Sequence, residues 1–389
     1  MKSPCLNIPS SSLRRQLLIA SSVLLSLAAQ AGTTLPFGDG ESISLGLGLR
    51  SSFASQSNGA PNGTDRSSDF NLDNLRLYID ASLGQGISAT FNTDRRSDGS
   101  IQVIDGFGEI SFAPGLNVRM GRLLPPGDRQ NMDGPFYQLA YDFPGTVSNF
   151  YAPSNAVGRD DGVAVWGRVA DKKLVYGIGA FQGRNHTSAT STTSNQSANL
   201  LYAGRLAYNF LAPEPTPAYY EGSTYFGTAG TILTATVAAM SQSDGVGNST
   251  IKSDYRASNL DLFFELPVAG GGALNLLGAY YKYDYSTAAY TADYSGDNGI
   301  SPPGKAYLLE GGYLFGNKVG MGRFQPFARY QKYDLDAGGT VKHTDFGVHY
   351  VIKGADARLS AFYVKDDQSG TGTTSVSSNA IKLAFQLQF

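Results

Sequence analysis

The chain has few of the residues on which several kinds of site depend. Among its 389 residues are one cysteine, Cys5, one tryptophan, Trp166, and three histidines. Cys5 lies in the N-terminal stretch considered next, so the rest of the chain offers no disulfide, thiolate nucleophile or cysteine-ligated metal. His186 lies in a Gly/Ser/Thr-rich stretch, whereas His343 and His349 are six residues apart on one strand face, too far for a compact metal site. We expect neither a metal ion nor a cofactor.

Long apolar runs are also missing, apart from one near the N-terminus. Leu17 to Ala29 is apolar, follows Lys2, Arg14 and Arg15, and precedes a small-residue A-x-A sequence ending at Ala31. This pattern predicts a signal peptide over residues 1–31 and a mature chain that starts at Gly32. A membrane anchor is the alternative, but the stretch is shorter than the roughly 20 apolar residues that a spanning helix needs.

Charge is sparse, because only 16% of the residues are Asp, Glu, Lys or Arg. Without the three basic residues of the predicted signal peptide, 27 basic residues remain against 32 acidic ones, a net charge of −5. A negative chain without basic clusters is a poor partner for nucleic acid. No charged linker or change of composition divides residues 32–389, which we interpret as one domain.

Apolar and polar residues alternate up to the last residue of the chain. The apolar members of this terminal stretch are Ile381, Leu383, Phe385, Leu387 and Phe389. A period of two indicates a strand with one apolar face. Similar runs between turn signals give about 16 strands, and 47 Gly, 23 Tyr and 21 Phe fit a β-rich wall with aromatic girdles. The sequence therefore predicts an all-β fold, a transmembrane antiparallel β-barrel. A soluble β-sandwich, whose strands also alternate, is the alternative.

The predicted connections alternate between short turns and longer polar loops. Short ones include Leu83 to Gly86 and Lys353 to Asp356, and long ones include Ser55 to Asp69, Ser241 to Lys252 and Asp366 to Ser378. Two fit less well: Ser97 to Ser100 is brief for a loop, and Pro213 to Gly222 is lengthy for a turn. Short periplasmic turns and long outer loops are typical of barrels in the bacterial outer membrane.

The longest connection, Leu123 to Asp160, follows the fifth predicted strand. It contains five prolines and six aromatic residues, which brace a loop against the wall. We expect it to fold inward as loop 3 and to narrow the lumen, with constriction residues Arg129, Asp133, Tyr137 and Tyr141. An external cap or a contact between subunits is the alternative.

Charged residues within strands indicate which face lines the lumen. A charge on the lipid face costs about 2 to 4 kcal/mol at the midplane, so such residues belong inside. The predicted pore-lining and anion-binding set is Arg76, Arg119, Arg122, Arg205, Arg323 and Arg329. Guanidinium groups in a row can pass phosphate or carboxylate groups along. The alternative is that each arginine pairs with a carboxylate on a neighbouring strand and stiffens the wall.

Four segments resemble, in order, the phosphate-selective porin O/P family. They are Asp105 to Glu109, Asn117 to Pro126, Arg159 to Val163 and Tyr176 to Gly183, within a likeness that extends over Asn74 to Gly183. The resemblance implies a 16-stranded homotrimer that passes anions through an inward loop and an arginine-lined channel. The chain departs from that pattern in its few lysines and its negative net charge.

The sequence as a whole favours a passive outer-membrane channel for small hydrophilic solutes. Transport through such a channel involves no covalent step. Its expected partners are outer-membrane lipid, small ionic or polar solutes and two further copies of the chain. The alternative function is a barrel whose loops carry an enzyme or adhesin activity. A hydrolase would need a nucleophile system with histidine, for which only three histidines are present.

Overall fold

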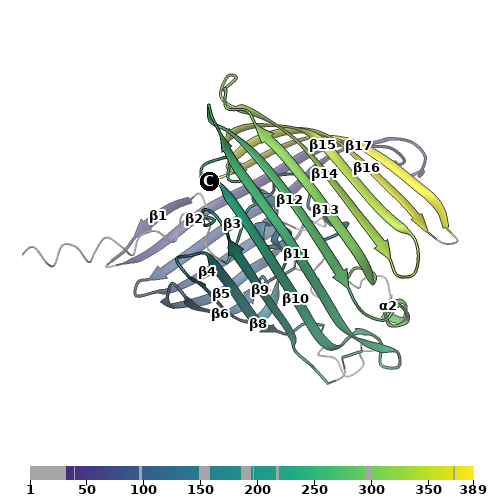
Figure 1. The fold of residues 1–389 in the computed structure, drawn as a ribbon, viewed down its shortest axis with the longest axis horizontal. Helices are drawn as coiled ribbons and strands as arrows, with labels where there is room; N and C mark the ends of the chain where they lie inside the picture. The colour runs from purple at the N-terminus through teal and green to yellow at the C-terminus, as the bar shows by residue number, and fades with distance from the viewer. Residues whose placement is uncertain are drawn as a thin grey trace, which may run out of the picture.

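The structure is a computed structural model that describes residues 32–38, 40–95, 99–148, 158–184, 194–195, 197–215, 219–293, 300–370 and 373–389. The signal peptide predicted over residues 1–31 and His186 lie outside these ranges. Most of the described chain is strand (Figure 1). The strands are β1 (Gly32–Pro36), β2 (Glu41–Gln56), β3 (Ser67–Leu83), β4 (Ile87–Arg95), β5 (Ile101–Ala113), β6 (Leu116–Leu123), β7 (Asp160–Val169), β8 (Leu174–Phe181), β9 (Leu201–Asn209), β10 (Ile232–Gly247), β11 (Lys252–Val268), β12 (Gly272–Tyr283), β13 (Gly304–Leu314), β14 (Arg323–Leu335), β15 (Thr340–Lys353), β16 (Ala357–Gly370) and β17 (Thr373–Gln388).

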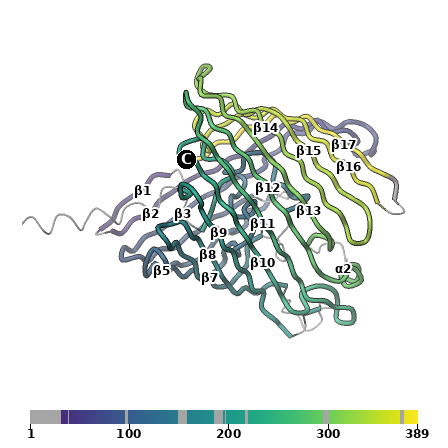
Figure 2. Tube along the Cα trace, viewed as in Figure 1, coloured from purple at the N-terminus to yellow at the C-terminus, as the bar shows by residue number. Residues whose placement is uncertain are grey.

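Strands β2 to β17 form a closed antiparallel barrel, as predicted. Each pairs with the next along the chain, and β17 pairs with β2 to close the ring, with Gln386 opposite Arg50. The chain can be followed around this ring in Figure 2. The short β1 pairs with β2 beyond the point where β17 ends, from Gly32 opposite Gly46 to Pro36 opposite Ser42. Phe389 exchanges two backbone hydrogen bonds with Leu47, so the terminal strand and β1 share one edge of β2.

The strand faces are divided by polarity in the way the alternation predicts. On β11, Leu260 and Leu262 are 52% and 51% exposed, whereas Asp261 and Glu265, on the other face of the strand, are 1% and 0% exposed. The last strand likewise exposes Ile381 and Leu383, each by 54%. Apolar side chains thus face outward and charged ones inward, the reverse of a soluble protein. The soluble β-sandwich is therefore excluded as an interpretation.

Strand length differs between the two halves of the ring. Strands β4, β6, β8 and β9 have 8 or 9 residues, whereas β10, β11 and β17 have 16 or 17. Two predicted loops, Ser241 to Lys252 and Asp366 to Ser378, are consequently mostly strand, which corrects that prediction. Their Ser and Asp residues resemble a loop in composition, but the backbone pairing of β10 with β11 and of β16 with β17 continues through them.

Among the residues that the structure describes, two short helices lie in the connections, α1 (Arg129–Tyr137) and α2 (Thr287–Asp293). Within α1 the backbone leaves helical geometry at Gly134, whose φ of 65° favours glycine, and Pro135 follows. This kink turns the chain sharply inside the barrel. In the described ranges no helix combines the length and apolar character required to cross a bilayer.

Candidate functional site in the barrel lumen

The first half of the connection after β6 lies against the inner wall of the barrel. We call residues 124–148 the inner loop. Arg358, Gln386 and Arg50 stand opposite one another on the adjacent strands β16, β17 and β2, and all three point inward. They donate hydrogen bonds to carbonyl oxygens of the inner loop, namely those of Phe136, Gln138, Leu139 and Tyr141. One side of the wall therefore holds the loop by its backbone.

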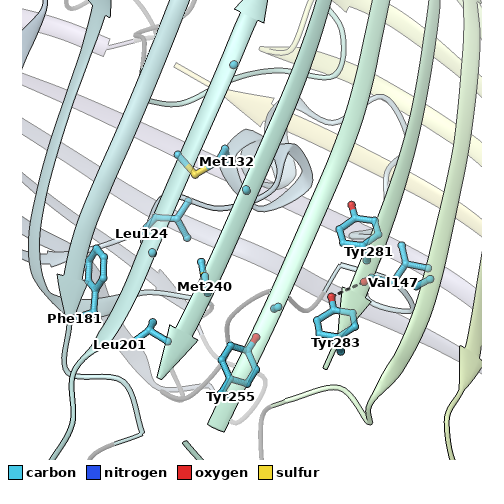
Figure 3. Packing of buried hydrophobic residues seen from close by; sticks show 14 of the residues in the cluster. Leu124, Met132, Val147, Phe181, Leu201, Met240, Tyr255, Tyr281 and Tyr283 are labelled. Carbon is cyan, nitrogen blue, oxygen red and sulfur yellow. Dashed lines mark hydrogen bonds between the residues drawn. The ribbon is translucent and has the colours of Figure 1, made fainter. Parts of the chain in front are cut away.

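The same loop also contacts β12. Tyr281 donates a hydrogen bond of 3.1 Å to Asp128, and Tyr283 donates one of 2.7 Å to the carbonyl oxygen of Val147, which Figure 3 shows. Leu124, Met132 and Val147 are 3% exposed or less and belong to one buried cluster with these tyrosines. The inner loop thus bridges the lumen between β12 and the strands β16, β17 and β2.

Tyr141 and Tyr137, two predicted constriction residues, lie in this bridge. The Tyr141 hydroxyl donates to Asp73 at 2.7 Å, and its ring centroid is 3.9 Å from the guanidinium carbon of Arg50. A cation over an aromatic face is stabilised by the ring quadrupole. Tyr137 accepts a backbone hydrogen bond of 3.1 Å from Ser223 through its carbonyl oxygen. Both tyrosines therefore join the inner loop to other parts of the chain.

A second connection enters the lumen from the opposite rim. Residues 210–231 join β9 to β10, and we call them the β9–β10 connection; residues 216–218 are outside the described ranges. Its buried residues dock on the inner loop: Tyr219 donates to the carbonyl oxygen of Leu124, the Glu221 amide donates to that of Met132 at 3.3 Å, and the Ser223 hydroxyl donates to Asp133. Two connections from opposite rims thus meet inside the barrel.

Arg129 of α1 is the charged centre of this contact. Its guanidinium lies 2.8 Å from Glu214, 3.6 Å from Glu221 and 3.3 Å from Asp261 of β11. It also donates to the carbonyl oxygen of Gly222 at 3.0 Å. Each of these four charged side chains is 8% exposed or less. Charged side chains buried this close together are stable only when they are paired with opposite charges. The ion pairs of Arg129 therefore hold both connections against the wall.

Burial changes the protonation of the docking groups. It raises the pKa of Asp133 well above its usual range, although the Ser223 hydroxyl and Arg129 oppose the shift. Burial also acts to raise the pKa of Glu214, but the neighbouring Arg129 outweighs it and lowers that pKa below the ordinary value. Asp133 therefore favours its neutral form while Glu214 favours the carboxylate that Arg129 requires.

Four of the six predicted pore-lining arginines lie inward and are paired. Arg76 contacts Asp94 at 2.8 Å, and Arg329 contacts Asp345 at 2.7 Å and Glu310 at 3.8 Å. Arg119 pairs with Glu109 and also lies within 5.4 Å of four aromatic rings, those of Phe107, Trp166, Tyr219 and Tyr220. Arg205 pairs with Glu221. These contacts agree with the alternative that arginines pair with neighbouring carboxylates.

The other two predicted arginines lie elsewhere. Arg122 has the same parity as Met120, which is 72% exposed on the outer face, and it pairs with the exposed Asp161 at 3.0 Å. The placement corrects its assignment to the lumen: a charge close to the end of a strand can reach water past the rim, so it need not point inward. Arg323 lies on the inward parity but at a rim, where it donates to the carbonyl oxygen of Gly271 at 2.6 Å.

Sequence reasoning missed the β9–β10 connection as part of the site. Glu214, Glu221 and Ser223 were not among the predicted residues, and the excessive length of Pro213 to Gly222 was the only signal. A turn of ordinary length cannot reach α1. Such excess length in a predicted turn is the pattern that indicates an inserted segment.

The described histidines have local partners. His343 lies 2.6 Å from Asp366, and His349 lies 2.8 Å from Ser360 and stacks on Phe327. In the part of the chain that the structure describes, no group of three or more His, Cys, Asp or Glu side chains is arranged to hold a metal ion.

Solved structures with a similar fold are outer-membrane proteins. An anion-selective porin from Comamonas acidovorans aligns with a TM-score of 0.59 at 14% identity, over 90% of this chain and 100% of that one. OprB of Pseudomonas putida gives 0.61 at 8% identity over 89% and 94%, and OmpF of Salmonella typhi gives 0.54 at 14% over 91% and 100%. No protein-family model and no curated protein matches the chain. These likenesses establish the porin-type barrel fold.

Proposed function

We propose that the protein is an outer-membrane channel through which small hydrophilic solutes diffuse passively. The observation that carries this proposal is the polarity of the barrel, with charged and polar side chains inside and exposed apolar side chains outside. The porin names of the neighbouring structures support it. A signal peptide over residues 1–31 would deliver the chain to the outer membrane.

Single-channel recording in planar bilayers tests this function. A diffusion channel gives discrete, ohmic openings that persist when the salt is replaced by larger solutes. A barrel that serves as an enzyme or adhesin through its loops gives a stable membrane protein without such openings, and that result would replace the channel proposal.

We further propose that the inner loop and the β9–β10 connection together set the width of the passage. Inward side chains beside them, such as Arg358, Gln386 and Glu265, are 0% exposed, which means that water does not reach them in this state. On β3 and β4, by contrast, the inward Asp80 and Thr90 are half-buried. We propose that solutes pass when the two connections separate, since their contact is made of hydrogen bonds and ion pairs that water can replace.

Acidic pH is expected to favour the closed contact. Docking raises the pKa of Asp133 above the value of about 3.9 for an exposed aspartate, so the docked form binds the proton more tightly. Docking is thus strengthened as pH falls through the raised pKa and weakened as pH rises above it. Conductance recorded from about pH 8 down to about pH 5 should fall, and Asp133→Asn should flatten the curve. The surface control Asp254→Asn should keep the curve of the parent, whereas an equally steep curve in Asp133→Asn would assign the effect to another group.

The anion preference implied by the family resemblance is proposed to reside in Arg50 and Arg358. These two arginines donate to backbone carbonyl oxygens and an asparagine. The inward arginines paired with carboxylates are Arg76, Arg119, Arg205 and Arg329. The name of the Comamonas acidovorans protein supports an anion preference, and phosphate is one anion to test. The reversal potential in a KCl gradient should favour chloride, and Arg50→Gln with Arg358→Gln should shift it toward cations. Replacing Arg119 and Arg329, which brace the wall, should shift it less.

The subunit arrangement is proposed to be a homotrimer. A similar solved structure, OmpT of Vibrio cholerae, is described as a trimer form. The short strands of this barrel expose large apolar residues such as Met120 and Ile178, at 72% and 57%. Light scattering of the detergent-solubilised protein tests this assignment, and a monomer mass would contradict it.

A further inference from the structure

Five neighbouring strands carry aromatic residues at one level of the outer surface. On β12 to β16 these are Tyr280, Tyr307, Tyr330, Phe346 and Tyr363. The ring centroids of Tyr280 and Tyr307 are 5.3 Å apart, and those of Phe346 and Tyr363 are 5.5 Å apart. Toward the rim where β17 ends, the outward positions are apolar and exposed, such as Leu309 at 64%. Aromatic rings at the edge of an apolar band mark the boundary between hydrocarbon and headgroups.

Lysines stand just beyond this aromatic row. Four strands repeat one pattern, in which one residue separates a tyrosine from a lysine. In each pair the lysine is the residue farther from the rim where β17 ends. Alternation keeps both side chains outward, and two residues correspond to about 7 Å along a strand. We call the following set the lysine belt: Lys282, Lys305, Lys332, Lys342 and Lys365. The belt lies at the depth of lipid headgroups.

The register places members of the belt directly against one another. Lys282 is opposite Lys305, and Lys332 is opposite Lys342. Like charges at directly opposed positions destabilise a sheet, so this arrangement needs anions from elsewhere.

Aspartates within the belt meet only part of that need. Asp284, Asp334 and Asp367 each accept from a lysine, at distances of 3.0, 2.7 and 2.9 Å. Three carboxylates stand against five ammonium groups, so the belt keeps an excess of positive charge although the chain as a whole is negative. The excess is therefore local to the headgroup level of the tall side of the barrel.

We propose that the lysine belt binds the phosphate groups of phosphorylated lipid headgroups in the outward leaflet of the outer membrane. The proposal rests on the membrane location given under the proposed function but concerns the outer surface, not the channel. Ammonium groups bind phosphate through charge-assisted hydrogen bonds, and clustered lysines near a membrane surface attract anionic lipid. A phosphate between two opposed lysines would relieve their repulsion and hold the lipid beside the aromatic row.

Lipid retention by the full-length protein tests this proposal. The probe is a disaccharide lipid carrying two phosphates, compared with the same lipid after removal of both phosphates, in neutral phosphatidylcholine nanodiscs. The test variant combines Lys282→Gln, Lys305→Gln, Lys332→Gln and Lys342→Gln. The control combines Lys172→Gln, Lys173→Gln, Lys318→Gln and Lys353→Gln; the first three lie in connections at the other rim, and Lys353 ends β15 there. Native mass spectrometry counts the lipid that stays bound.

The parent and the control are expected to retain the phosphorylated lipid, and the belt variant should bind it at least about tenfold more weakly. The dephosphorylated lipid should bind weakly to all three proteins. Equal retention by the belt variant, or equal binding of both lipids by the parent, would overturn the proposal. A change of oligomeric mass in the belt variant would instead identify the belt as a subunit interface and would also overturn it. Single-channel conductance, recorded in parallel, should be the same in all three proteins, so a failure of the channel proposal is seen separately.

Discussion

A cross-link between residues 133 and 223 is expected to hold the channel closed. The hydroxyl of Ser223 donates to Asp133 where the β9–β10 connection meets α1. The chain has one cysteine, and it lies within the predicted signal peptide, so Asp133→Cys with Ser223→Cys gives a clean pair for a short, reducible bis-thiol reagent. If solutes pass by separation of the two connections, as proposed, conductance should fall about tenfold on cross-linking and return on reduction.

Controls for this experiment use the same reagent. Each single-cysteine variant should conduct with and without it, and a pair within one rigid hairpin, Ser258→Cys with Lys282→Cys, should conduct after cross-linking because those residues already face each other on β11 and β12. Unchanged conductance in the cross-linked 133–223 protein would mean that solutes pass without separation of the two connections. The constriction would then lie elsewhere in the lumen.

Replacing Arg129 with methionine is expected to cost about 3–5 kcal/mol of unfolding free energy, because a buried ion pair loses one partner. Glu214, Glu221 and Asp261 would remain in the interior without the cation that all three contact. The docking of both connections would weaken at the same time, so the variant should also open more often. Urea unfolding in lipid vesicles, followed by fluorescence of the single tryptophan, Trp166, measures the stability.

Trp166 suits this measurement because it reports from the lumen, where its indole N–H donates to Glu109 at 2.9 Å. Arg256→Met is the matched control: its side chain is 63% exposed and its ion pair with Asp254 lies at the surface, so the expected change is within about 0.5 kcal/mol. Arg129→Lys should restore only part of the stability, since an ammonium group cannot reproduce the two contacts of the guanidinium with Glu214. Equal stability of the parent and Arg129→Met would show that the three carboxylates are protonated or hydrated in solution.

The barrel itself could be predicted from local alternation, since each strand must place an apolar side chain in lipid at every second position. For example, the alternation of apolar and polar residues in the sequence around them is enough to predict that Leu260 faces outward and Asp261 inward. The positions where strands end were predicted less accurately. The polar hairpins of β10 with β11 and β16 with β17 resemble loops in composition, and only the pairing across the sheet identifies them as strands.

The lumen was predicted less well, because its contacts join residues far apart in sequence. Nothing in the sequence near Arg129 indicates that Glu214 and Asp261 will surround it, at separations of 85 and 132 residues. The structure places Arg76, Arg119, Arg205, Arg323 and Arg329 on the inward parity and Arg122 on the outward one, near a strand end where a charged side chain can reach water. Parity assigns a face, whereas pairing decides whether a guanidinium is available to a solute.

The sequence alone determined the architecture, because the period of its apolar residues is a local property that a bilayer converts directly into a closed antiparallel wall. Only the tertiary structure decided what occupies the interior. The ring brings the inner loop and the β9–β10 connection together from opposite rims, and the resulting ion pairs depend on distances through space that no period along the chain records.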